Sequence, residues 1–200
     1  KKIKIFTENS NDEEILKFED QKDNLFSILQ NQKIFNQLII ELKKSKFLKF
    51  KKYIKYRKFD NFSYDLIINC DIRNEITKKY FSKKFEKKYD SIAFTTIIDH
   101  KKLSLNNEAT QIFTNDGPIA FLPISNEKTS IVYSARMKKY KTESEINKII
   151  NKFNPKYEIN KIHKISKFDL KSIILREYYK DNILAFGDLL HKLHPLAGQG

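Results

Sequence analysis

The chain has 200 residues, of which 40% are apolar and 13% aromatic. This composition can build one sizeable core or two modest ones, and it excludes a disordered chain. With only 4 glycines and 4 prolines, a fibrous repeat is excluded as well. The net charge of +14 rests on lysines spread from Lys1 to Lys192, with only four arginines. Because base and phosphate recognition relies on arginine, we expect no nucleic-acid partner.

The first half of the chain alternates between expected strands and helices. A polar, acidic connection through Asp23 follows the first strand, and apolar residues then fall at helical spacing. The expected elements are a strand at Lys2 to Phe6, a helix at Gln32 to Lys44, a strand or hairpin at Phe47 to Phe59, a buried parallel strand at Tyr64 to Cys70, and a short helix at Glu75 to Phe81.

The second half predicts an antiparallel sheet and then a return to a parallel strand. Asn115-Asp116-Gly117-Pro118 is a strong turn pattern, and Thr142 opens a capping box with Glu145. The expected strands are Ser91 to Asp99, Glu108 to Phe113, Ile119 to Ile124, Ser130 to Ser134, Lys167 to Tyr179 and Asn182 to Phe186, with a helix from Thr142 to Phe153. We therefore expect an α/β (α+β) protein with two interleaved lobes.

The end of the chain carries the residues best suited to a dinucleotide site. A buried strand runs into Gly187 and Asp188, and Pro195, Leu196, Ala197, Gly198, Gln199 and Gly200 follow. Glycines allow the backbone to approach a flat ring closely, and a carboxylate accepts hydrogen bonds from sugar hydroxyls. We expect no metal site, because His191 and His194 precede a proline without a third ligand nearby.

The pattern G-D-x-x-H-x-x-H-P-x-A-G-Q-G, at residues 187–200, resembles the second flavin-binding motif of group A FAD-dependent aromatic hydroxylases of the ubiquinone-biosynthesis family. A second block, Gln111 to Ile124, resembles this family's substrate-side sheet. The resemblance implies that Asp188 binds the flavin's ribityl or phosphate region and that residues 195–200 lie against its ring. It also implies FAD as cofactor, NAD(P)H as reductant, dioxygen as co-substrate and a prenylated aromatic quinone precursor as substrate. No catalytic side chain is assignable.

The resemblance also predicts the domain organisation. Residues 1–88 would be the middle of a Rossmann-like FAD/NAD(P)-binding domain, and 89–180 an antiparallel substrate domain with a helix near 142–153. Residues 181–200 would return to the first domain. Because the family's G-x-G-x-x-G segment is absent, we expect a fragment cut at both ends and inactive by itself. We expect a cytoplasmic location. We also expect peripheral association with the inner membrane or with a biosynthetic complex.

The family's middle motif is altered, which leaves other functions open. At the position of G-A-D-G this chain has Asn69-Cys70-Asp71-Ile72, so Asp71 is a weaker candidate flavin ligand. Ile72 would be strained if its φ were positive. The alternatives are a degenerate, non-catalytic scaffold in quinone biosynthesis and a related FAD oxidoreductase with another aromatic substrate.

Several side chains have a structural interpretation beside the functional one. Cys70 is expected to be a small core residue, and His100 and His163 surface histidines. One apolar face could either line a pocket for a prenylated ring or simply fill the core. The residues of that face are Ile92, Phe94, Phe113, Phe121 and Val132.

Overall fold

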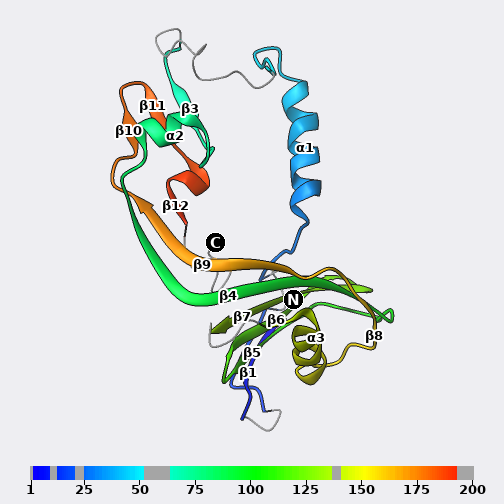
Figure 1. Ribbon diagram of the computed structural model, residues 1–200. Coiled ribbons are helices and arrows are strands. Elements are labelled where there is room, and N and C mark those ends of the chain that lie inside the picture. The colour runs from blue at the N-terminus through cyan, green and yellow to red at the C-terminus, as the bar shows by residue number, and fades with distance from the viewer. Residues whose placement is uncertain (1, 10–12, 21–24, 52–63, 137–140, 193–200) are drawn as a thin grey trace. The chain divides into compact units, whose positions relative to one another are not determined.

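The computed structural model describes residues 2–9, 13–20, 25–51, 64–136 and 141–192 of the chain. Contacts divide the chain into two compact units (Figure 1). Unit 1 contains Lys1–Glu41 and Asp90–Asp169, and unit 2 contains Leu42–Tyr89 and Leu170–Gly200. The boundaries fall at the end of the helix α1 (Asn31–Lys43) and within the strands β4 (Lys84–His100) and β9 (Ser166–Leu175).

Unit 1 is built on a mostly antiparallel sheet. Its strands run in the order β4-β7-β6-β5-β1-β2, and β8 also pairs with β4. Their bounds are β1 Lys2–Thr7, β2 Leu16–Glu19, β5 Glu108–Thr114, β6 Gly117–Ser125, β7 Lys128–Arg136 and β8 Ile159–Ile162. The expected antiparallel strands are thus confirmed, while β1 pairs in parallel with β5 and β2 forms the edge beyond it.

The β5–β6 hairpin depends on Gly117. Thr114 faces Gly117 across the turn, and Gly117 has a φ of +136°, which residues with side chains rarely adopt. A Cβ built at Gly117 would also overlap the main-chain carbonyl oxygen of Ser134 on β7. The glycine therefore lets three strands approach closely at this corner.

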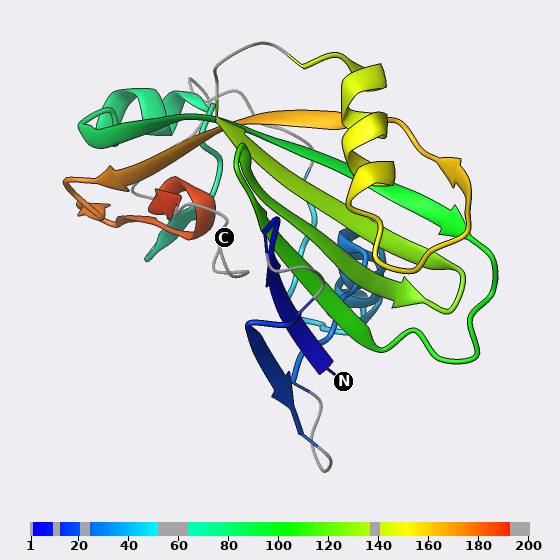
Figure 2. The same cartoon turned by 90° about the horizontal axis from the view of Figure 1, so that it is seen from below.

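Helix α3 (Glu143–Lys152) covers one face of the sheet in unit 1 (Figure 2). The capping box predicted at Thr142 and Glu145 is present and opens the helix. Ile146 and Ile150, one turn apart, are fully buried against the sheet. Each such buried side chain stabilises the fold by roughly 1.5–3 kcal/mol relative to exposure.

The predicted apolar face is divided between the two sides of this sheet. Ile92, Phe94 and Phe121 belong to the core beneath α3, as strand alternation requires. Val132 pairs with Thr95 and Ala120, and Phe113 pairs with Pro118. Phe113 and Val132 therefore lie on the opposite side, where Phe113 is 42% exposed. The prediction of a single face is wrong for these two residues.

Unit 2 contains a small sheet in the order β10-β11-β3. The strands β3 (Ile67–Asn69) and β11 (Ile183–Ala185) are parallel, and β10 (Tyr179–Lys180) is antiparallel to β11. Helix α2 (Glu75–Tyr80) begins after Asn74, whose side chain accepts a hydrogen bond from the Thr77 amide. The core of this unit consists of Ile67, Phe81, Leu175, Ile183, Ala185 and Leu189.

The mixed α/β class is confirmed, whereas several local predictions need correction. Residues 47–51 form no strand, and the rest of the predicted strand at Phe47 to Phe59 lies largely outside the described residues. The predicted strand at Lys167 to Tyr179 is interrupted after Leu175, and Cys70 is exposed rather than part of the core. The assignment of residues 1–88, 89–180 and 181–200 to flavin and substrate domains stays a prediction.

Candidate flavin site at the ends of two parallel strands

The described candidate flavin-binding residues follow two neighbouring parallel strands of unit 2. Asn69 pairs with Ala185 at the carboxyl ends of β3 and β11, and the Phe186 amide donates to the Asn69 carbonyl at 3.0 Å. Asp71 lies two residues beyond the end of β3, and Gly187 lies two residues beyond the end of β11. Ligands of parallel α/β sheets bind at this edge of the strands. The two sequence motifs are therefore brought to the same edge.

The loop after β3 is fixed by a network of side-chain hydrogen bonds. Asn69 is buried and donates through Nδ2 to Thr77 Oγ1 at 2.8 Å, while Asn74 Nδ2 donates to Asn69 Oδ1 at 2.6 Å. Thr77 Oγ1 in turn donates to the Asp71 carbonyl. The carboxylate of Asp71 accepts a hydrogen bond from the Arg73 amide at 2.7 Å. This network holds Asp71 in a defined loop at the strand end.

Ile72 does not strain this loop. Among the described residues other than glycine, only Asp90 and Asp181 have a positive φ. Ile72 is 53% exposed and has an ordinary backbone conformation. The strain considered from the sequence is absent because the φ of Ile72 is not positive.

The corner after β11 leaves open space in front of its glycine. Gly187 has a φ of +64°, and a Cβ built there meets no atom of the described residues within 4 Å. Asp188 is exposed in the short 3-10 helix η3 (Gly187–Leu189), whereas Leu189 is anchored in the core of the unit. An exposed carboxylate beside open space fits the hydroxyls of a ribityl or ribose group. Pro195, Leu196, Ala197, Gly198, Gln199 and Gly200 lie outside the described residues.

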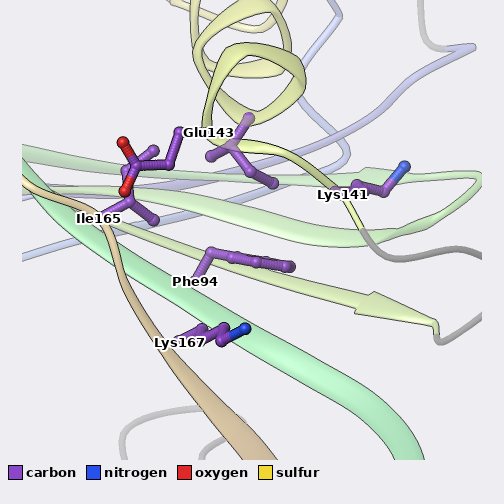
Figure 3. A pocket seen from close by; sticks show the side chains of 6 residues that line it. Phe94, Lys141, Glu143, Ile165 and Lys167 are labelled. Carbon is purple, nitrogen blue, oxygen red and sulfur yellow. The ribbon is translucent and has the colours of Figure 1, made fainter.

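A cavity of about 190 Å³ lies beside helix α3 in unit 1 (Figure 3). Ordinary ligand pockets measure about 300 to 1,000 Å³. Phe94 and Ile146, which line the cavity, belong to the hydrophobic core, and Lys141 at its rim is paired with Asp116 at 2.9 Å. The cavity is too small for a tricyclic ring, so it does not contribute to the candidate site.

His100 lies in a buried polar cluster that the sequence did not predict. Its Nε2 lies 3.0 Å from Thr129 Oγ1, and Asn106 Nδ2 donates to the same hydroxyl at 3.1 Å. Tyr157 donates to Asn106 Oδ1 at 3.1 Å, and burial raises the pKa of Tyr157. Each of these polar groups has a partner, which indicates a structural role beneath α3. The prediction of a surface histidine at His100 was wrong.

His163 is half-buried and bound to a carboxylate. Its Nε2 lies 2.8 Å from Asp99 Oδ2, and Lys128 Nζ lies 3.0 Å from the other oxygen of Asp99. The hydrogen bond from Lys128, and then that from His163, lowers the pKa of Asp99. In the described parts of the chain, no three His, Cys, Asp or Glu side chains gather closely enough to hold a metal ion.

The fold is shared with flavin-dependent enzymes of known structure. The flavin-dependent halogenase CmlS has a TM-score of 0.54 at 16% identity, over 68% of this chain and 27% of its own. Aklavinone-11 hydroxylase, solved as a ternary complex with FAD and aklavinone, has a TM-score of 0.53 at 11% identity, over 66% of this chain and 27% of its own. The fold class is therefore that of flavin-dependent halogenases and hydroxylases.

The sequence is similar to curated ubiquinone-biosynthesis proteins. The mitochondrial ubiquinone biosynthesis monooxygenase COQ6 of Drosophila melanogaster is 25% identical over 180 residues, which cover 70% of this chain and 38% of that protein. COQ6 of Mus musculus is 28% identical over 153 residues, 56% of this chain and 32% of its own. This chain thus spans about a third of the length of these relatives. No family model matches the chain. The resemblance to flavoprotein hydroxylases is confirmed as weak homology with a shared fold.

Proposed function

We propose that this chain is part of an FAD-dependent monooxygenase that hydroxylates the aromatic ring of a ubiquinone precursor. The observation that carries the proposal is the shared strand edge in unit 2, where Asp71 and Gly187–Asp188 follow two adjacent parallel strands. The weak similarity to COQ6 monooxygenases and the flavin-enzyme fold support the same activity. The chain spans about a third of those relatives, so the proposal concerns the full-length protein.

The described residues would bind and orient the cofactor. Asp188 is exposed at the strand end and would accept hydrogen bonds from the hydroxyl groups of the ribityl or ribose part of FAD. Gly187 leaves the approach free of a side chain, and the Asn69–Thr77–Asn74 network would hold Asp71 in place. When bound and reduced by NAD(P)H, FAD would supply the activated oxygen for the hydroxylation. Residues 195–200 are proposed to lie against its ring.

The side of the unit 1 sheet that lies opposite helix α3 is half-buried, and it is proposed to face the aromatic substrate. Helix α3 fills the other side, where Ile92, Phe94 and Phe121 belong to the core. Val132 and Leu122 on the half-buried side offer an apolar surface of the kind that suits a prenylated ring. The sequence relatives are ubiquinone biosynthesis monooxygenases, which supports a prenylated precursor as the substrate class.

The cofactor assignment is tested by the flavin content of the full-length protein. Asp188→Ala should abolish or strongly reduce the FAD that copurifies with it. Asp65→Ala is the matched control, because Asp65 is an exposed carboxylate at the opposite, amino-terminal end of β3. Absorption spectra and FAD titration measure the difference. Equal flavin loss in both variants, or none in either, would contradict the placement of FAD at this edge and favour a non-catalytic scaffold.

The reaction is tested with the flavin-loaded protein, NADH or NADPH, dioxygen and a prenylated phenol. The expected product gains one oxygen atom on the ring, detected by mass spectrometry. Substrate-stimulated oxidation of NAD(P)H without an oxygenated product would refute hydroxylation of that substrate.

A further inference from the structure

The buried polar side chains in the described part of unit 2 belong to Asn69 and Thr77. Asn69 is 4% exposed and Thr77 8%, and Asn69 Nδ2 donates to Thr77 Oγ1 at 2.8 Å. A buried polar group without a partner costs free energy, whereas a fully bonded network fixes one arrangement of its members. Both side chains are covered by this chain's own residues, so their burial does not depend on any further polypeptide.

The hydrogen bonds of the Asn69–Thr77–Asn74 network run in a fixed direction. The main-chain amide of Thr77 can only donate, and it donates to Asn74 Oδ1 at 2.9 Å. Asn74 therefore presents its Nδ2 to Asn69 Oδ1, at 2.6 Å, and Asn69 presents its own Nδ2 to Thr77 Oγ1. The single hydroxyl proton of Thr77 then goes to the Asp71 carbonyl, which can only accept. Because the network begins and ends on main-chain groups, neither side-chain amide can turn over without losing a bond.

Asn69 also connects this loop to the second motif. Its main-chain carbonyl accepts a hydrogen bond from the Phe186 amide at 3.0 Å, and Gly187 and Asp188 follow directly in the chain. Asn69 ends β3, and Phe186 follows β11, the neighbouring parallel strand. One residue therefore holds the loop of Asp71 through its side chain and the corner after β11 through its main chain.

The competing interpretation is that these side chains only cap helix α2. A cap requires no more than Asn74 Oδ1, which accepts from the Thr77 amide. It requires neither the bond from Asn74 Nδ2 to Asn69 nor the bond from the Thr77 hydroxyl to the Asp71 carbonyl. Asn69 also stands where the G-A-D-G motif of the flavoprotein hydroxylases begins with glycine, which has no side chain to form such a network.

We propose that Asn69 and Thr77 are positioning residues that set Asp71 and the Gly187–Asp188 corner together, so that the two motifs at this strand edge form one unit. This role rests on the proposed flavin site and names the side chains that keep it in its binding arrangement. Because the network is closed among this chain's own residues, it needs no atom of the cofactor. The edge therefore holds its arrangement before the cofactor binds.

The sharpest test is Asn74→Asp, which replaces one amide group by an oxygen. Aspartate caps a helix as well as asparagine does, so α2 keeps its first hydrogen bond. The other carboxylate oxygen would face Asn69 Oδ1, and the Asn69 amide would have to turn over to donate to it. The Thr77 hydroxyl would then donate to Asn69, and the Asp71 carbonyl would lose this bond while the helix is retained.

Amide hydrogen exchange of the full-length protein measures the coupling and requires no flavin. Mass spectrometry follows a loop peptide, residues 71–77, and a corner peptide, residues 185–190. Asn74→Asp and Thr77→Val should speed exchange in both peptides by roughly three- to tenfold, whereas Thr77→Ser, which keeps the hydroxyl, should exchange as the parent does. Ile183→Val is the matched control, because it removes a buried methylene group at the amino end of β11. It should lower the urea midpoint without a selective change in either peptide.

Titration of the same full-length variants with FAD tests the consequence for the cofactor. Asn74→Asp and Thr77→Val should raise the FAD dissociation constant by roughly three- to tenfold, and Thr77→Ser should restore the value of the parent. The visible circular dichroism of bound flavin, which reports the surroundings of its ring, should change in the first two variants. It should not change in Ile183→Val.

Two results would overturn the proposal. Faster exchange in the loop peptide alone, with the corner peptide as in the parent, would leave Asn69 and Thr77 with a role in the loop only. Equal FAD binding by the parent and all variants would remove the positioning role. A parent that binds no FAD would contradict the proposed function instead, and the exchange of the corner peptide would still decide whether the two motifs are coupled.

Discussion

Replacing Gly117 by alanine should destabilise unit 1 by about 2 to 6 kcal/mol. The φ of +136° lies in a region that costs a residue with a side chain about 1 to 3 kcal/mol. The added Cβ would also overlap the Ser134 carbonyl oxygen, and moving a packed strand costs about 1 to 3 kcal/mol more. Urea unfolding followed by far-ultraviolet circular dichroism measures the difference.

Gly187→Ala provides the matched control for this prediction. Gly187 also has a positive φ, +64°, but a Cβ built there meets nothing within 4 Å in the described part of the chain. Only the left-handed backbone costs free energy at that position, about 1 to 2 kcal/mol. If both alanine substitutions lower the free energy of unfolding of their own unit by the same amount relative to the parent, the steric argument at Gly117 is refuted.

Three further predictions concern the core and the charges of unit 1. Ile150→Ala should reduce the free energy of unfolding by about 2 to 5 kcal/mol, because this fully buried side chain would leave a cavity beneath α3; urea unfolding measures it. Tyr157→Phe should cost about 1 to 3 kcal/mol in the same assay, since it removes a buried donor to Asn106. Lys128→Gln should raise the pKa of Asp99 in an NMR titration of its carboxyl group, because the hydrogen bond from Lys128 is the largest cause of its lowering.

The pH dependence follows from the sign of the Asp99 shift. A carboxyl group whose folded pKa is lowered stabilises the fold fully above its unfolded pKa, 3.8, and loses that contribution as the pH falls through the folded value. The Lys128→Gln variant should therefore show a smaller loss of stability on acidification than the parent. An unchanged Asp99 titration in this variant would contradict the assigned cause.

Ile40→Ala is the control for Ile150→Ala. Because Ile40 is 53% exposed on α1, its replacement by alanine should have little effect on stability.

The features predicted correctly from the sequence are those that depend on neighbouring residues. The Asn115–Gly117 turn and the Thr142 capping box are determined within four residues, so the hairpin and α3 could be placed accurately. The buried strand before Gly187 and Asp188 was also placed correctly, since β11 ends at Ala185; the binding of flavin by these two residues stays a prediction. Local hydrogen bonding and strand alternation carry this information.

The features that the sequence missed depend on distant partners or lack an apolar pattern. All four residues of β2 are exposed, so no alternation marks that strand. His100 is buried by contacts with Thr129 and Tyr157, which lie 29 and 57 positions further along the chain. Cys70 was placed in the core because an apolar run precedes it, yet β3 ends at Asn69, whose side chain organises the following loop instead.

The division of the chain into units has a consequence for its synthesis. Neither unit is a continuous stretch, because Leu42–Tyr89 and Leu170–Gly200 form one, and the segments before and between them form the other. During translation, unit 1 cannot complete its β4–β8 pairing until Ile162 has left the ribosome, and β3 waits for β11 still longer. A nascent chain stalled near residue 100 would therefore expose unpaired strands from both units, which makes it a substrate for chaperones.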